Sequence, residues 1–134
     1  MIKFNEVSFK YSQESSVKNQ VLSNFNLDIE AGQVVVVTGE SGCGKTTVGR
    51  LINGLSPNFY EGTLVGDVEV CGMHPGEQEL YDTARVVGSI FQNPRTQFFN
   101  VDTTSEITFA CENQGIDRQL IKDRLDEVVS DFKI

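Results

Sequence analysis

The chain has 134 residues, 39% of them hydrophobic and 22% charged, a composition that is typical of a soluble globular protein and excludes a wholly disordered one. Eleven basic residues stand against nineteen acidic ones, and the net charge of −8 argues against a protein that binds nucleic acid through its phosphates. The longest aliphatic run, Val34–Val37, is far shorter than the ~20 residues of a membrane-spanning helix, and no signal region opens the chain, so we expect a cytoplasmic protein.

Strands are predicted near the N-terminus. Residues 2–9 alternate for the most part between apolar and polar side chains, which indicates a half-buried strand. Residues 11–20 are polar and are expected to form a loop, whereas residues 25–29 alternate again and predict a second strand. Val34–Val37 is continuous and β-branched, which is typical of a strand that is buried on both faces in a parallel sheet.

A glycine-rich loop at residues 39–44 leads into a predicted helix. Apolar side chains recur after the loop at the spacing i, i+3, i+4 and i+7, which indicates one apolar helix face. These side chains are Val48, Leu51, Ile52 and Leu55. Gly54 and Pro57 are expected to end the helix, and residues 63–71 predict a further strand that Gly66 interrupts.

The remainder of the chain is predicted to be mostly helical. Residues 76–84 predict a short helix and residues 86–91 an apolar strand. Thr103 and Glu106 have the spacing of a capping box, which satisfies free N–H groups at a helix start. Asp117 is expected to cap a second helix that continues to the last residue. Its apolar face is formed by Leu120, Ile121, Leu125, Val128, Val129 and Phe132.

The motif that decides the functional class lies at residues 39–46, where the sequence GESGCGKT matches the pattern GxxxxGK[ST]. Glycines let the backbone curl until successive N–H groups point at phosphate oxygens, and the dipole of the helix that follows favours an anion. Lys45 supplies a positive charge to the β- and γ-phosphates, and the hydroxyl of Thr46 is placed to bind Mg²⁺. The motif follows a predicted strand and precedes an amphipathic helix, so it predicts nucleotide binding.

With this motif in place, the chain resembles the ATPase subunit of an ABC transporter over essentially its whole length. Residues 7–11 (VSFKY) resemble the segment whose aromatic residue stacks on adenine, which implies that Tyr11 is the stacking residue. Residues 27–33 (LDIEAGQ) resemble the strand and turn that lead into the phosphate loop. Residues 90–94 (IFQNP) resemble the Q-loop, which implies that Gln92 touches Mg²⁺ or the attacking water and senses a membrane partner.

The resemblance implies an α/β fold of the P-loop nucleoside triphosphate hydrolase type, with an antiparallel β portion near the N-terminus. It implies ATP and Mg²⁺ as ligands, Lys45 and Gln92 as catalytic residues, and Thr46 and Gln92 as groups that hold the metal. The residues expected to contact the nucleotide are Tyr11, Gly39, Glu40, Ser41, Gly42, Cys43, Gly44, Lys45, Thr46 and Thr47.

Residues 92–99 and 111–115 resemble the energy-coupling-factor branch of the family, which powers the uptake of vitamins and of cobalt or nickel. This likeness implies two partners. One is a second ATPase subunit, identical or different, and the other is an integral membrane transporter subunit that docks near Gln92–Phe99. The protein would then be peripheral on the inner face of the cell membrane, and the transported solute stays open.

Other motifs of the family do not occur in the sequence, among them the signature motif, the Walker B aspartate with its catalytic glutamate, and the switch histidine. We therefore expect residues 1–134 to be the N-terminal part of one ATP-binding domain, truncated, inactive in hydrolysis and prone to aggregate through an exposed sheet edge. Three alternatives stay open: a non-hydrolysing binding fragment or remnant, a soluble ABC-type protein without a transport role, and an unrelated P-loop kinase or GTPase.

Four single residues carry further expectations. The polar neighbours of Tyr11 predict an exposed side chain. Phe98 and Phe99 belong either to the core or to a groove that receives a helix of a membrane subunit. Cys43 is expected to be a tolerated small residue of the loop.

Overall fold

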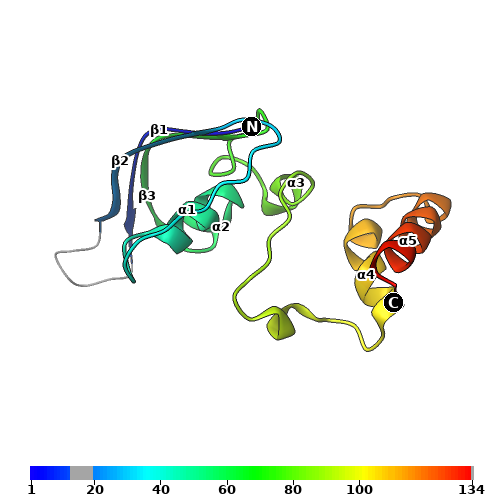
Figure 1. Cartoon of the computed structure of the whole chain (residues 1–134). Helices are drawn as coiled ribbons and strands as arrows, with labels where there is room; N and C mark the ends of the chain where they lie inside the picture. The colour runs from blue at the N-terminus through cyan, green and yellow to red at the C-terminus, as the bar shows by residue number, and fades with distance from the viewer. Residues whose placement is uncertain (13–19, 134) are drawn as a thin grey trace. The chain divides into compact units, whose positions relative to one another are not determined.

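The computed structural model describes residues 1–12 and 20–133 and divides the chain into two units, Met1–Ser89 and Ile90–Ile134. Figure 1 shows the elements of the first unit, which are β1 (Ile2–Tyr11), β2 (Gln20–Ile29), α1 (Lys45–Ile52), α2 (Leu55–Asn58), β3 (Gly62–Val70) and α3 (Leu80–Thr83). The second unit holds the 3-10 helix η1 (Pro94–Gln97), α4 (Thr103–Asn113) and α5 (Arg118–Phe132). None of the helices in the described part of the chain combines the length and the apolar character needed to cross a membrane.

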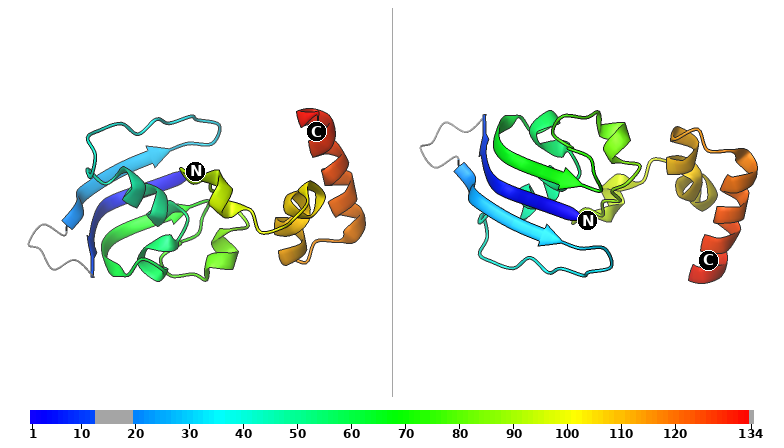
Figure 2. Two further views of the ribbon diagram at one scale, coloured as in Figure 1. Left: turned by 90° about the horizontal axis from the view of Figure 1, so that it is seen from below. Right: turned by 90° about the horizontal axis from the view of Figure 1, so that it is seen from above.

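An antiparallel sheet with the order β2-β1-β3 forms one layer of the first unit. Ile2 lies opposite Ile29 on one side and opposite Val70 on the other, so β1 is the central strand (Figure 2). The three strands predicted at residues 2–9, 25–29 and 63–71 are thereby confirmed. The loop predicted at residues 11–20 falls mostly outside the described residues.

A β-bulge sets which side chains of β1 reach the core. Between Phe4 and Ser8 the strand carries one residue more than either neighbour. Glu6 in the bulge has φ = 50°, and Gly66 beside it on β3 has φ = 90°. A Cβ atom on Gly66 would lie 2.5 Å from the carbonyl oxygen of Glu6, so only glycine fits there. The extra residue brings Val7 to the same face as Phe4, where strict alternation would place it on the opposite face.

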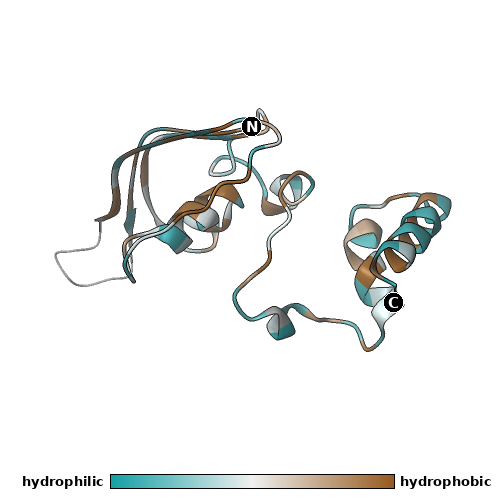
Figure 3. Cartoon of the chain, in the orientation of Figure 1, coloured by the Kyte–Doolittle hydropathy of each residue, from teal (hydrophilic) through white to brown (hydrophobic). Residues whose placement is uncertain are grey.

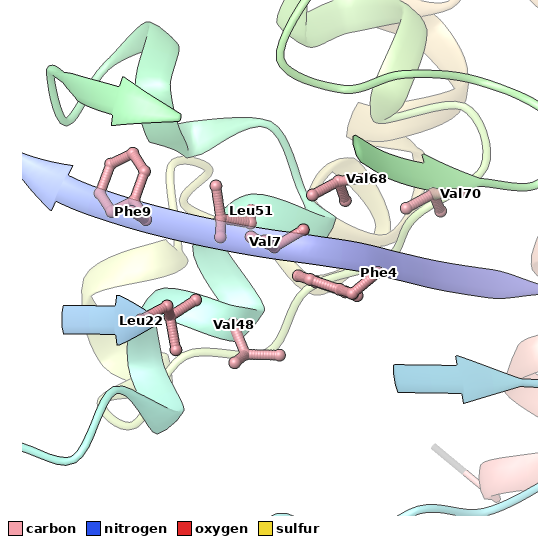
Figure 4. Packing of buried hydrophobic residues seen from close by; sticks show 8 residues of the cluster. All are labelled: Phe4, Val7, Phe9, Leu22, Val48, Leu51, Val68 and Val70. Atoms are coloured by element: carbon pink, nitrogen blue, oxygen red, sulfur yellow. The ribbon is translucent and has the colours of Figure 1, made fainter. Parts of the chain in front are cut away.

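The hydrophobic core lies between this sheet and α1. Val48 and Leu51 of α1 pack against the side chains of all three strands, and each is less than 5% exposed (Figure 4). The eight buried apolar residues are Phe4, Val7, Phe9, Leu22, Val48, Leu51, Val68 and Val70. The amphipathic helix predicted after the glycine-rich loop is confirmed, and it ends at Ile52.

The prediction of a buried strand at Val34–Val37 is wrong. The exposed fractions of its four valines lie between 44% and 94%, and the segment forms no strand. A strand satisfies its N–H and C=O groups only when neighbouring strands lie beside it, and within the described sheet none pairs with this segment. Figure 3 shows the apolar stretch outside the sheet. The strand predicted at residues 86–91 is wrong for the same reason, with Ile90 92% exposed.

The N-terminus of α4 differs in detail from the predicted capping box. Asp102 is the N-cap, and its carboxylate accepts hydrogen bonds from the N–H and the hydroxyl of Ser105, at 2.9 and 2.7 Å. Glu106 reaches further back and accepts from the N–H groups of Phe99 and Asn100. The prediction of Thr103 in the capping position is therefore wrong, because a carboxylate one residue earlier caps the helix with a charge-assisted bond.

Three other helix boundaries can be compared with the predictions. The helix predicted at residues 76–84 is confirmed but is limited to α3, Leu80–Thr83. Asp117 caps α5 as predicted, accepting a hydrogen bond from the N–H of Gln119 at 2.9 Å. This helix ends at Phe132, since Lys133 adopts the left-handed conformation with φ = 55°, whereas the sequence pattern predicted that it continues.

Candidate functional site

The loop at residues 39–44 enters α1 with three glycines in the positive-φ region. Gly39, Gly42 and Gly44 have φ values of 150°, 83° and 101°. A Cβ atom on Gly44 would lie 3.0 Å from both the carbonyl oxygen of Val21 and a methyl carbon of Leu22. The backbone at Gly44 therefore requires glycine both for its conformation and for its close contact with β2.

Lys45 folds back into this loop. Its ammonium donates hydrogen bonds to the carbonyl oxygens of Gly39 at 2.8 Å and Glu40 at 2.6 Å, and it lies 3.7 Å from the sulfur of Cys43. The side chain is half-buried, while the loop around it is mostly exposed. The loop thus curls around one positive charge, whose partners among residues 1–12 and 20–133 are neutral acceptors. An anionic ligand offers that charge a stronger partner than a carbonyl does.

The N-terminus of α1 adds hydrogen-bond donors to the same place. Gly44 is the N-cap and has no side chain that can cap the helix, and the N–H of Val48 makes the first helical bond, to Gly44 at 3.0 Å. The N–H groups of the first turn before Val48 have no partner within the helix. The positive end of the helix dipole coincides with Lys45, so loop, helix and ammonium together suit a phosphate group.

Tyr11 is tied to α1 instead of standing free in solvent. Its side chain is half-buried and its hydroxyl forms a hydrogen bond with the hydroxyl of Thr47 at 3.1 Å. The guanidinium of Arg50 donates a second bond to the same oxygen, also at 3.1 Å, and the ring of Phe9 meets that of Tyr11 edge to face at 4.8 Å. The prediction of an exposed Tyr11 is therefore wrong. It considered only the polar residues next to Tyr11 in the sequence, whereas the residues that cover it, Thr47 and Arg50, belong to α1.

The phenol of Tyr11 also has a changed acidity. Burial alone raises its pKa, but the hydrogen bonds from Thr47 and Arg50 and the charge of Arg50 outweigh burial, so the pKa is lowered from its ordinary value of 10.0. The phenol oxygen thus lies in a polar and positively charged environment at the side of α1.

Two adjacent threonines in the first turn of α1 face different surroundings. Thr46 is exposed, so its hydroxyl is open to a ligand at the mouth of the loop. Thr47 is only 4% exposed and its hydroxyl is bonded to Tyr11. Both threonines were predicted to contact the nucleotide. The side chain of Thr46 is accessible to a ligand, whereas that of Thr47 is hydrogen-bonded to Tyr11 of β1.

Gln92 belongs to the second unit, whereas the phosphate loop belongs to the first. It is exposed, and Asn93 after it caps η1 by accepting a hydrogen bond from the N–H of Arg95 at 3.3 Å. The N–H of Phe91 donates to the side-chain oxygen of Gln97 at 3.4 Å. The turn from Phe91 to Gln97 therefore has its own local hydrogen bonds.

Phe98 and Phe99 lie at the surface of the second unit. Their exposed fractions are 64% and 76%, so the interpretation of both as core residues is wrong. Phe99 stacks on Phe109 of α4, with ring centroids 5.6 Å apart, which holds its ring in place while leaving one side open. Val101, two residues further along the chain, is fully exposed as well, so three large apolar side chains of this segment are left uncovered by the unit that carries them.

The sequence patterns did not point to Arg50 or Tyr60. The guanidinium carbon of Arg50 lies 3.7 Å from the ring centroid of Tyr60 and 5.9 Å from that of Tyr11. The spacing of Thr47 and Arg50, three residues apart on a predicted helix, would have shown that both face the same side. Nothing in the sequence indicates that Tyr11 and Tyr60 both lie near Arg50, since they come from segments far apart in the chain.

Comparison of the sequence with known proteins identifies the family to which the chain is similar. Residues 22–134 match the family described as ABC transporter. Over 134 residues the chain is 45% identical to a protein of Treponema denticola provisionally named an ABC transporter ATP-binding protein, and it covers 27% of that protein.

Two relatives carry a more specific name, Energy-coupling factor transporter ATP-binding protein EcfA1. The chain is 34% identical over 125 residues to that of Ligilactobacillus salivarius, which is 93% of the chain and 42% of the relative. It is 33% identical over 129 residues to that of Oceanobacillus iheyensis, which is 96% of the chain and 43% of the relative. The chain thus spans less than half the length of these curated relatives.

Proposed function

The chain belongs to the ABC transporter family of ATP-binding proteins, and we propose that it binds ATP in the loop at residues 39–46 as part of the ATP-binding component of a solute importer. The observation that carries this proposal is the ammonium of Lys45, which points into the loop at 2.8 and 2.6 Å from two carbonyl oxygens, beside an open helix N-terminus. A positive charge beside N–H groups that have no partner within the helix favours a polyphosphate.

In this proposal each residue near the loop has one task. Lys45 exchanges its carbonyl partners for the β- and γ-phosphate oxygens, and the N–H groups at the start of α1 donate to the same phosphates. The exposed hydroxyl of Thr46 would hold Mg²⁺, which when bound neutralises phosphate charge. The ring of Tyr11 stacks against the base.

Hydrolysis is proposed for the full-length protein and not for these residues by themselves. Lys45 stabilises negative charge on the phosphates, but a group that positions or activates the attacking water is needed as well. Gln92 is the proposed residue that orients this water, and no apolar run followed by Asp-Glu occurs in the sequence to supply a catalytic glutamate. We therefore expect nucleotide binding by this chain with negligible turnover.

The proposed partners are a second ATPase subunit and an integral membrane transporter subunit. The exposure of Phe98, Phe99 and Val101 supports the second of these, because three apolar side chains shortly after Gln92 are 64%, 76% and 104% exposed and a bound subunit would cover them. The relatives named EcfA1 are called transporter ATP-binding proteins, which supports solute uptake by the energy-coupling-factor route and a place on the inner face of the cell membrane.

Lys45→Ala tests the assignment. Titration calorimetry of the full chain with Mg·ATP should show an affinity loss of about 10- to 150-fold, because a charge-assisted hydrogen bond contributes ~1.5–3 kcal/mol. Lys122→Ala is the matched control, since Lys122 is exposed on α5, and it should leave the affinity unchanged. Equal affinity of the Lys45→Ala variant and the parent chain would refute nucleotide binding at this loop.

A further inference from the structure

Arg50 connects the elements beside the phosphate loop. It lies on α1, its guanidinium donates a hydrogen bond to the hydroxyl of Tyr11 at 3.1 Å, and its central carbon lies 3.7 Å above the ring centroid of Tyr60. A guanidinium over an aromatic ring at this distance makes a cation–π contact. Tyr60 thus holds the planar group of Arg50 from one side while Arg50 holds Tyr11.

The ring of Tyr11 is fixed at several points. Phe9 meets it edge to face with centroids 4.8 Å apart, and Thr47 and Arg50 both bond its hydroxyl at 3.1 Å. A phenol held at its oxygen and at its ring has few orientations left. An aromatic ring that is already oriented loses little conformational freedom when a flat ligand stacks on it, so it binds that ligand more tightly than a mobile ring.

The two residues that hold this hydroxyl belong to the helix that begins at the phosphate loop. Thr47 is two residues and Arg50 five residues after Lys45, and Thr47 and Arg50 lie on one side of α1. The position of the Tyr11 ring is therefore set relative to Lys45 through a rigid helix. A nucleotide needs its base site and its phosphate site at a constant separation, because one molecule occupies both.

We propose that Arg50 is a positioning residue of the base site, which holds the ring of Tyr11 at a set place relative to the phosphate loop for a purine nucleotide. The inference rests on the proposed binding of ATP and on stacking at Tyr11, and it adds a residue that touches neither phosphate nor metal. The same contact contributes to the lowered pKa of the Tyr11 phenol, through the hydrogen bond and the charge of Arg50.

The test compares Mg·ATP with Mg-tripolyphosphate, which has the phosphates but no base. Loss of a base–aromatic stack is expected to weaken ATP binding about 5- to 150-fold in Tyr11→Ala. Arg50→Met in the full chain is expected to weaken ATP binding about fivefold, as a mobile ring stacks less well, and to leave tripolyphosphate affinity unchanged. Arg85→Met is the matched control, because Arg85 lies over Tyr81 at 5.7 Å and its loss should change neither affinity.

A second variant guards against a failure of Arg50→Met to fold. Tyr11→Phe removes the hydroxyl that Arg50 and Thr47 hold but keeps the ring and the charge. It should weaken ATP binding to a similar extent, and combining it with Arg50→Met should add little, because both changes break the same contact.

A spectroscopic measurement distinguishes a direct contact of Arg50 with the Tyr11 hydroxyl from a general contribution of Arg50 to the stability of the fold. The sequence has three tyrosines, so in a Tyr60→Phe/Tyr81→Phe background Tyr11 is the sole phenol, and its ionisation can be followed by ultraviolet absorbance. Arg50→Met should raise the pKa of Tyr11 in that background, and Arg50→Lys, which keeps the charge, should raise it less.

The possible outcomes separate the two proposals. Equal losses for ATP and tripolyphosphate in Arg50→Met, or no loss for ATP, would overturn the positioning role and leave nucleotide binding intact. Unchanged ATP affinity in Tyr11→Ala would overturn the base site and the role of Arg50 together. Unchanged affinity in Lys45→Ala would refute the proposed function itself.

Discussion

A pair of glycine substitutions in and near the phosphate loop tests the geometry of the candidate site. Gly44 is the N-cap of α1 with φ = 101°. Gly49 lies inside the same helix, where an added Cβ atom would meet no described atom within 4 Å apart from the neighbouring residues and backbone of the helix itself. Gly44→Ala should destabilise the protein and Gly49→Ala should stabilise it. The two changes add the same methyl group, so a difference in sign must come from the local backbone and its neighbours.

The structure gives the size of each effect. Alanine at residue 44 is forced into a left-handed conformation, and its Cβ atom would lie 3.0 Å from the carbonyl oxygen of Val21 and from a methyl carbon of Leu22. Left-handed strain together with a displaced neighbour should lower the free energy of unfolding by about 2–3 kcal/mol. Gly49→Ala should raise it by ~1 kcal/mol, because alanine is the better helix former and fills open space.

Urea unfolding of the full chain, followed by circular dichroism, measures both changes in free energy. Gly44→Ala should also weaken Mg·ATP binding, because a shift at the N-cap moves the N–H groups of the first turn, while Gly49→Ala should leave binding unchanged. The same sign of stability change in both variants would refute the left-handed conformation at Gly44 and the close contact with β2.

Two other outcomes follow from packing and from charge. Leu51→Ala should lower the free energy of unfolding by about 2–5 kcal/mol in the same urea experiment, because Leu51 is 1% exposed in the core. Leu120→Ala on α5 is the control and should change this free energy by less than ~0.5 kcal/mol, because Leu120 is 44% exposed. Hydrogen bonds from the N–H groups of Ser105 and Asn100 lower the pKa values of Asp102 and Glu106, so their stabilisation of α4 is present above about pH 4.5 and disappears as the pH falls through the lowered values. An Asp102→Asn/Glu106→Gln variant should lose this acid-dependent part of the helical signal in circular dichroism; an unchanged acid profile would contradict the capping role.

Local sequence signals predicted much of the first unit. The alternation in residues 2–9 and 25–29 indicated two strands that form. The recurrence of apolar residues every three or four positions after the loop indicated the face of α1 that Val48 and Leu51 bury. The motif at residues 39–46 predicted a glycine-rich loop that leads into an amphipathic helix, and the structure has that helix directly after the loop. Each of these features depends on residues within a few positions of one another.

Features that depend on distant parts of the chain were predicted less well. Val34–Val37 has the composition of a buried strand, but strand formation needs partners beside it, and composition carries no information about them. The polar neighbours of Tyr11 suggested an exposed ring, whereas the ring is held by a helix whose residues follow it by more than thirty positions. Phe98 and Phe99 are as apolar as core residues, and only their placement shows that they lie at the surface.

The sequence by itself therefore determined the class of the protein, because the phosphate loop is a short contiguous motif whose glycines, lysine and threonine act through their own backbone and the next helix. Only the tertiary structure decided that β1 carries a bulge at Phe4–Ser8 and that Arg50 meets Tyr11 and Tyr60. These features arise when strands and helices from distant segments pack, and the contacts that select them are absent from any local window of the chain.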